Sequence, residues 1–375
     1  MKILLALMPL TLALAAPARD FFVYFGTYTN ALSRGIYVSR LESGTGRLSA
    51  PELAAETPNP SYLAIAPTGK FLYAANEVGS SGGGEAGLVS AFAIDQKTGR
   101  LALLDQKSSG GAWPCHLSVD ATGAALLVAN YDAGSVKSFQ LRDDGGLGAE
   151  GSFVRHHGAS VNASRQTGPH AHCIIPDPAN RFALACDLGT DKVMVYRLNS
   201  AAGTLTDASV ATLPPGSGPR HLAFSDNGKF VHVLNEMGCT LSTFGWDSRA
   251  GQMAPVETVS ALPPEVPVQP GFTAAEIVVA GKFVYVTIRG HDSVGVFSIE
   301  ARTGRLRYRQ NLPTGGQVPR GLGVDPTGHW LLVGNQNSHT VTEFAINPRT
   351  GLLAPTGQSL NIGSPVDVKF VACHR

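Results

Sequence analysis

A seven-fold internal repeat constrains this 375-residue chain more than any other feature. In each repeat a proline, or a residue in its place, opens a short apolar run, and the runs recur roughly every 50 residues. A hairpin turn follows each of the first six runs, for example Asp226-Asn227-Gly228-Lys229. Glycine and Asn or Asp supply the positive φ that such turns require. The seven opening residues are Pro60, Pro114, Pro169, Pro219, about Ala274, Pro319 and Pro365.

A second apolar strand, a third strand and a glycine-containing outer turn complete each repeat. Outer turns occur seven times but inner hairpins only six, so we expect the two ends of the chain to share the seventh blade. Residues 364–371 would supply its innermost strand, and residues 21–25, 36–41 and 48–53 the other three. Four short antiparallel strands per repeat, without a helical period, predict an all-β fold, a seven-bladed β-propeller. Its ring would be closed by N- and C-terminal strands in one blade, which removes free sheet edges.

One domain, residues 19–375, would contain all seven repeats. The first 18 residues differ in character, because Lys2 precedes an apolar run and Ala16-Pro17-Ala18 fits a signal cleavage site. The run is shorter than the roughly 20 residues that a spanning helix needs. We therefore interpret residues 1–18 as a removed secretion signal rather than a membrane anchor. The mature protein is expected to be periplasmic or secreted, without membrane attachment.

Composition narrows the class of partner. The net charge is +1 and charged residues make up 15% of the chain, so nothing indicates nucleic acid or an anionic membrane as a partner.

Five cysteines leave at least one thiol free or paired between molecules. Cys173 and Cys186 fall on neighbouring expected strands and could pair in an oxidising compartment. The alternative is five small, buried, apolar side chains. Neither composition nor motifs predict the oligomeric state.

The repeats bring polar side chains to one mouth of the central channel. Innermost strands of a propeller run parallel around the channel, so residues of equal register form a ring. One position after each opening residue, this ring is expected to include His170, Arg220 and Arg320. The second strands return to the same mouth, where Glu236 and Arg289 stand. Guanidinium groups bind carboxylate or phosphate in bidentate fashion, so this convergence indicates a site for an anionic ligand.

Each of these residues also has a purely structural interpretation. Propeller channels are generally wet and lined with polar groups, and Glu236 could simply pair with Arg220 to hold the mouth in shape. His172 lies one step deeper and could fill the channel, which makes His170, nearer the rim, the better catalytic candidate. Asp187 could orient His170 or serve as a turn residue. The His170-x-His172 pair could begin a metal site, but no third ligand stands at a telling spacing, so a metal is not expected. The sequence contains no P-loop and no Rossmann fingerprint, so no other cofactor is expected.

The run from Val161 to His172, which contains Arg165-Gln166-Thr167-Gly168-Pro169-His170-Ala171-His172, resembles a motif of the seven-bladed propeller lactonase family. Gly218 to Phe224, Leu234-Asn235-Glu236, Val318 to Gly321 and Phe25 to Thr29 are similar to other elements of that family. The resemblance spans about residues 21–371. It implies a lactone site in the channel mouth, as in the propeller type of 6-phosphogluconolactonase and the fungal carboxy-muconate cyclases. The site residues it implies are His170, Arg220, Glu236, Arg289 and Arg320.

We therefore predict an enzyme, a metal-independent lactonase of the 6-phosphogluconolactonase type that hydrolyses a sugar-acid or related lactone. Glu236 or His170 would activate water as general base, and His170 could protonate the leaving alkoxide. Arg220 and Arg289 would bind the substrate's oxygens and stabilise the oxyanion. Arg165 and Gln166 lie on a loop that would close over or brace the mouth. The residues expected to bind substrate are Arg289, Arg320, His172, Arg165, Gln166 and Asn235.

Two other functions remain open at this point. The same scaffold could carry out an intramolecular lactonisation, as the cyclases do, and proton transfer without water uptake would distinguish it. A non-catalytic binding propeller would instead use the arginine cluster for an acidic ligand. The expected partner of the hydrolase is a small, anionic lactone substrate. A secreted protein does not easily meet 6-phosphogluconolactone, so that particular substrate is not implied.

Overall fold

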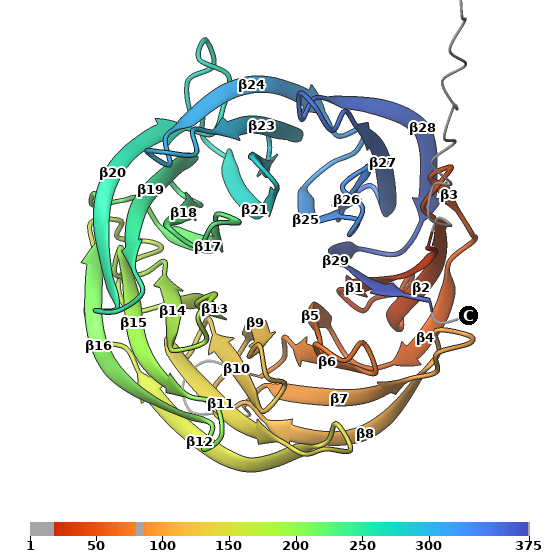
Figure 1. Ribbon diagram of the computed structural model, residues 1–375, viewed down its shortest axis with the longest axis horizontal. Helices are drawn as coiled ribbons and strands as arrows, with labels where there is room; N and C mark the ends of the chain where they lie inside the picture. Colours follow the sequence, from red (N-terminus) through yellow and green to blue (C-terminus); the bar gives the residue numbers. More distant parts are fainter. Residues whose placement is uncertain (1–18, 80–85, 374–375) are drawn as a thin grey trace, which may run out of the picture.

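Seven antiparallel sheets surround a central channel like the blades of a propeller (Figure 1). The computed structural model describes residues 19–79 and 86–373, so the expected secretion signal, residues 1–18, lies outside the described residues. Within the described part of the chain every regular element is a strand. The predicted all-β, seven-bladed propeller with four antiparallel strands per blade is therefore confirmed.

Blades I to VI follow one another along the chain, and within each blade the strands run in sequence order from the channel outward (Figure 1). The strands of blade I are β5 (Pro60–Ile65), β6 (Phe71–Asn76), β7 (Leu88–Ile94) and β8 (Leu101–Ser108). Those of blade II are β9 (Pro114–Val119), β10 (Ala125–Asn130), β11 (Ser135–Leu141) and β12 (Leu147–Arg155). Those of blade III are β13 (Ala171–Pro176), β14 (Phe182–Asp187), β15 (Lys192–Asn199) and β16 (Thr204–Thr212).

The next three blades repeat this arrangement. Blade IV contains β17 (Pro219–Phe224), β18 (Phe230–Asn235), β19 (Thr240–Asp247) and β20 (Gln252–Ser260). Blade V contains β21 (Thr273–Ala280), β22 (Phe283–Arg289), β23 (Ser293–Ile299) and β24 (Leu306–Pro313). Blade VI contains β25 (Pro319–Val324), β26 (Trp330–Asn335), β27 (Thr340–Ile346) and β28 (Leu353–Asn361).

Both ends of the chain build blade VII. Its innermost strand, β29 (Pro365–Ala372), pairs along its length with β1 (Phe21–Thr27), and β2 (Gly35–Glu42) follows. The outer strand, expected over residues 48–53, is broken into β3 (Arg47–Leu48) and β4 (Glu52–Glu56), both paired with β2. The prediction that N- and C-terminal strands close the ring in one blade is thus confirmed, with the outer strand divided.

Burial follows the position of a strand within its blade. The second strands β10, β14 and β18 are buried at every residue, because neighbouring blades cover both of their faces. Outer strands such as β12 are mostly exposed or half-buried, as expected for a sheet edge that faces water. The rigid, buried inner strands therefore form the framework that holds the channel-lining side chains.

The five cysteines are all free and buried. Cys173 and Cys186 are direct cross-strand partners on β13 and β14, so the predicted proximity is confirmed. They nevertheless stand as thiols, which corresponds to the alternative of five small buried side chains.

Candidate active site

An irregularity near the start of each innermost strand sets the first ring of residues at the channel mouth. In blade IV, Pro219 pairs with Asn235 and His221 with Leu234, so Arg220 has no partner and forms a β-bulge. A bulge bends the strand and re-aims its side chain. The other blades have the same shift. The residues at this bulge are Ser61, Cys115, His172, Arg220, Ala275 with Glu276, Arg320 and Val366.

His172, and not His170, holds the ring position in blade III. Ala171 pairs with Asp187 and Cys173 with Cys186, which leaves His172 at the bulge. The expected ring position of His170 was wrong by two residues, because Ala171 takes the place of the opening proline and Pro169 precedes the strand. His172 therefore takes the ring position that the repeat pattern predicted for His170, and His170 does not line the cavity.

Seen from the cavity, His170 lies behind Tyr131, which lines the cavity while His170 does not. The two rings stack with their centroids 4.5 Å apart, and the Nδ1 atom of His170 is 3.0 Å from the backbone oxygen of Tyr131. Asp187 accepts a hydrogen bond from the backbone nitrogen of His170 and contacts the ring of His156, so it does not orient the His170 ring. His170 thus supports a wall of the site from outside.

A second ring stands one residue beyond the partner of each opening residue. Five of its seven members line one cavity of about 360 Å³, together with bulged residues from the first ring and a few loop residues. In chain order the second ring is Tyr28, Glu77, Tyr131, Leu188, Glu236, Arg289 and Gln336. The cavity is lined by Tyr28, Glu77, Trp113, Cys115, Tyr131, Arg165, His172, Glu236, Thr273, Arg289 and Arg320.

Glu236 is the centre of one side of this cavity. Its Oε1 accepts a hydrogen bond from Arg165 at 2.8 Å, and its Oε2 lies 3.0 Å from Nε of Arg220 and 2.9 Å from a terminal nitrogen of Arg289. Burial alone would raise the pKa of this carboxyl, but the charges of Arg289, Arg220 and Arg165 hold it well below its usual range. Glu236 is therefore a carboxylate whose two oxygens are both occupied by guanidinium groups.

Arg220 lies beneath this carboxylate rather than in the cavity. It is 2% exposed, and its other guanidinium nitrogen donates to the backbone oxygen of Ala275. The neighbouring His172 is also buried, with Nε2 3.9 Å from Oε2 of Glu236 and Nδ1 3.7 Å from the Cys115 sulfur. Burial, together with the positive charge of Arg220, holds the pKa of His172 well below its usual range, so the ring is neutral near pH 7.

The opposite side of the cavity has a separate cluster. The Tyr28 hydroxyl donates to Oε2 of Glu77 at 2.7 Å, and Arg320 lies 3.9 Å from the same oxygen with its guanidinium over the Tyr28 ring. The sequence interpretation included Arg320 but did not single out Tyr28 or Glu77. Both stand where Glu236 stands in its own blade, so the equal register of the repeats was the signal that could have identified them.

Aromatic and loop residues complete the rim. Arg165 donates to the Tyr131 hydroxyl as well as to Glu236, and so joins the long loop to two blades. Trp113 is 42% exposed at the cavity edge, and its φ of 55° is an unusual backbone conformation for an aromatic residue. Such flat aromatic surfaces suit the carbon face of a sugar ring.

Two residues expected to bind substrate have structural partners instead. Gln166 is fully buried, and it donates to the backbone oxygen of Leu188 and accepts from the backbone nitrogen of Asn162. It braces the loop that carries Arg165. The amide of Asn235 donates to Thr240 and Ser242 within blade IV, and the side chain does not line the cavity.

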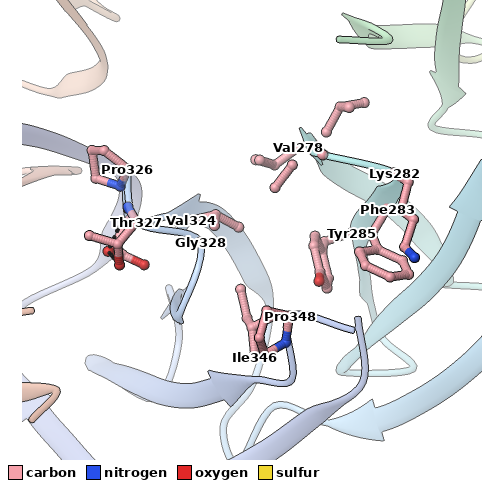
Figure 2. A pocket seen from close by; sticks show the side chains of 14 residues that line it. Val278, Lys282, Phe283, Tyr285, Val324, Pro326, Thr327, Gly328, Ile346 and Pro348 are labelled. Carbon is pink, nitrogen blue, oxygen red and sulfur yellow. Dashed lines mark hydrogen bonds between the residues drawn. The ribbon is translucent and has the colours of Figure 1, made fainter. Parts of the chain in front are cut away.

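A second cavity lies at the other end of the strands, between blades V and VI (Figure 2). It is larger, about 550 Å³, and mostly apolar. The β21–β22 hairpin turns through Gly281, whereas the β25–β26 turn is longer and held by Asp325, whose carboxylate accepts from Thr327, His329 and Trp330. The lining of this second cavity includes Lys282 but no convergent set of catalytic groups. The smaller cavity at the channel mouth is therefore the candidate active site.

Comparison with known proteins agrees with this assignment of the fold. Residues 22–370 match the family described as lactonase, 7-bladed beta-propeller. The chain belongs to this family. This lactonase is 34% identical to the 6-phosphogluconolactonase of Bacillus subtilis over 348 residues, which cover 93% of this chain and 97% of the relative. It is 30% identical to the 6-phosphogluconolactonase of Formosa agariphila, over 90% of this chain and 96% of the relative.

A solved structure gives a similar result. The periplasmic gluconolactonase of Pseudomonas aeruginosa superposes on this lactonase with a TM-score of 0.88 and 33% identity, covering 95% of this chain and all of that one. The predicted family and the predicted lactonase activity are therefore confirmed, over the alternative of a non-catalytic propeller. In the part of the chain that the structure describes, no helix is long and apolar enough to span a membrane. The same part contains no group of three residues suited to hold a metal ion.

Proposed function

We propose that this lactonase opens the lactone of a sugar acid in the mouth cavity, with Arg165, Arg289 and His172 contacting the reacting ester. The observation that carries the proposal is the arrangement around Glu236, where one buried carboxylate fixes three guanidinium groups at 2.8 to 3.0 Å. Donors held in place in advance stabilise an oxyanion without reorganisation during the reaction. The guanidinium groups of Arg165 and Arg289 are the ones that also line the cavity.

The roles of Glu236 and Arg220 follow from their contacts. With both oxygens engaged and a lowered pKa, Glu236 is a weak base, so we assign it the role of holding the arginines. Arg220 holds Glu236 from beneath. His172 is neutral and can donate or accept one hydrogen bond at the ester or at a substrate hydroxyl. His170 keeps Tyr131 in place and has a supporting role.

The charge of the cavity favours an anionic substrate. Three arginines and two glutamates line the cavity, which leaves one net positive charge, and the buried Arg220 adds one more. Arg320 is the lining arginine whose charge is least neutralised, because its nearest described carboxylate oxygen lies 3.9 Å away, on Glu77. A carboxylate or phosphate on the substrate would complete the pairing at Arg320.

The same guanidinium groups supply the positive charge that a metal ion would otherwise bring to the ester, so we propose a metal-independent reaction.

We also propose that the mature protein is periplasmic or secreted. The leading residues have the character of a secretion signal, and the Pseudomonas aeruginosa gluconolactonase is a periplasmic protein. Mass spectrometry of the N-terminus of the protein recovered from a cell-envelope fraction would reveal whether residues 1–18 are removed.

Two lactones test the site and its charge preference together. Glucono-δ-lactone and glucaro-lactone differ in a terminal group, which is neutral in the first and a carboxylate in the second. Titration of released acid at constant pH should give turnover of both, with the higher kcat/KM for the carboxylate and no loss after chelator treatment. No turnover of either would contradict lactone hydrolysis of this class, a reversed preference would contradict the anionic substrate, and loss with chelator would contradict the metal-free reaction.

A further inference from the structure

A second carboxylate reaches the cavity from the side opposite Glu236. Glu77 follows the last residue of β6 in blade I, and Glu236 follows the last residue of β18 in blade IV. These inner strands lie on different sides of the channel (Figure 1). The site therefore has two glutamates at the same register of the repeat, and the reaction as described so far uses only one of them.

The two carboxylates have different surroundings. Both oxygens of Glu236 are taken by guanidinium groups. Glu77 accepts one hydrogen bond, from Tyr28 to Oε2, and its nearest arginine nitrogen is 3.9 Å away. With the described residues, Oε1 of Glu77 makes no hydrogen bond or ion pair. A carboxylate with a free oxygen in a substrate-sized cavity can accept a proton from a water molecule.

The remaining candidates for this role are weaker. His172 is buried beside Arg220, and their like charges oppose the imidazolium that would form if the ring accepted a proton. His170 does not line the cavity, and one of its ring nitrogens already contacts the backbone of Tyr131. Tyr131 is a neutral phenol whose oxygen accepts from Arg165.

Resting on the function proposed above, we propose that Glu77 is the general base of this lactonase. Oε1 takes one proton from water as the water oxygen bonds to the lactone carbonyl carbon, and the charge passes to the carbonyl oxygen. That oxyanion lies toward Arg165 and Arg289. When it collapses, the ring carbon–oxygen bond breaks and Glu77 returns the proton to the departing ring oxygen. One water and one lactone give one hydroxy acid, and the enzyme is unchanged.

The backbone around Glu77 suits such a role. Its nitrogen donates to the backbone oxygen of Asn59, and Asn59 in turn donates from its side-chain amide to the backbone oxygen of Glu77. Tyr28 fixes one carboxylate oxygen, so the other has a defined direction. The side chain is 13% exposed, which excludes most competing water while leaving access from the cavity. Catalysis by a positioned base depends on this combination of fixed geometry and access.

The test uses glucono-δ-lactone and the variants Glu77→Gln, Glu77→Ala and Tyr28→Phe, with the exposed Glu52→Gln as a matched control. Glu77→Gln should lower kcat by about 10²- to 10⁴-fold with a much smaller change in KM. Formate, a small carboxylate, should restore part of the activity of Glu77→Ala in a concentration-dependent manner. Tyr28→Phe should lose far less than Glu77→Gln and gain nothing from formate.

Three outcomes would overturn the assignment. The first is a Glu77→Gln variant with the kcat of the wild type. The second is a Tyr28→Phe variant as inactive as Glu77→Gln, because Glu77 would then act only by positioning Tyr28. The third is an inactive Glu77→Ala variant that formate does not rescue. If Glu77→Gln does not fold, Glu77→Asp withdraws the carboxylate by one methylene, and an unchanged kcat would equally overturn the role. A wild-type protein inactive on every lactone would contradict the proposed function itself, whatever these variants do.

Discussion

Arg165 and Arg289 bind different oxygens of the same buried carboxylate, Glu236, at 2.8 and 2.9 Å. One comes from a long loop before blade III and the other from the end of β22 in blade V. A single glutamate on blade IV thus joins three parts of the ring and sets the distance between two cationic groups of the cavity. Substitutions of Glu236 should therefore change both the folding stability and the chemistry.

Replacing Glu236 by glutamine should destabilise the protein by about 3–5 kcal/mol at pH 7, because three guanidinium groups lose their shared counter-charge in a buried site. The folded-state pKa of this carboxyl is lowered, so its stabilising effect is complete above the unfolded value of about 4.3 and is lost as the pH falls through the folded value. Melting temperatures should differ strongly at pH 7, and the gap should shrink toward pH 3. A gap that is constant with pH would contradict the ion-pair account.

Arg320→Met should reduce the preference for an anionic lactone. Arg320 has the least neutralised charge in the cavity lining, so the variant should lose roughly tenfold or more in kcat/KM for glucaro-lactone, as expected for one lost charge-assisted contact. The loss for glucono-δ-lactone should be much smaller. Arg349→Met, at an exposed outer turn, is the matched control. Equal losses on both substrates would show that Arg320 does not bind the anionic group.

Because His172 lines the cavity and His170 does not, two equivalent substitutions should have unequal effects. His172→Asn removes a ring from the cavity lining, and kcat should fall by about 10²-fold if it contacts the ester. His170→Asn leaves the lining intact and removes only the stack on Tyr131, so its effect should be less than about tenfold. The measurement is the kcat of both variants on one lactone. A larger loss of kcat for His170→Asn than for His172→Asn would contradict the register described for blade III.

Deletion of residues 366–375 should lower the melting temperature far more than loss of ten surface residues normally would. It removes most of β29, which pairs with β1 and closes the ring. The exposed edge of β1 would also invite association between molecules. Deleting only residues 374–375 is the control. A shortened protein that melts and elutes like the full-length chain would show that the ring does not depend on this strand.

The repeats allowed most of the fold to be predicted. Seven turns and seven apolar openings specify seven blades, and the one missing inner hairpin requires closure through the termini. The register within blade III was missed for a physical reason. Most innermost strands begin at a proline, but β13 begins at Ala171, and Pro169 stands two residues earlier in the preceding loop. The rule that a proline opens each innermost strand located blade III correctly but placed the start of its first strand two residues too early.

The site was predictable in part for a similar reason. Arg289, Arg320, Glu236 and His172 were identified because charged or ionisable side chains stand out against apolar strands, and all four line the cavity. Side-chain direction was not predictable, so Arg220 was expected in the cavity although it lies beneath Glu236. Gln166 and Asn235 were expected to meet substrate although their amides are engaged within the protein.

The central claim is that lactone hydrolysis takes place in the mouth cavity between Glu236 and the opposite cluster. The most direct measurement is the kcat/KM for glucono-δ-lactone of the mature protein and of Arg289→Met, with Arg349→Met as control and melting temperatures to verify folding. Arg289 lines the cavity and is held by Glu236, so we predict a loss on the order of 10²-fold or more in a folded variant and none in the control. A folded Arg289→Met protein with the kcat/KM of the wild type would contradict the account.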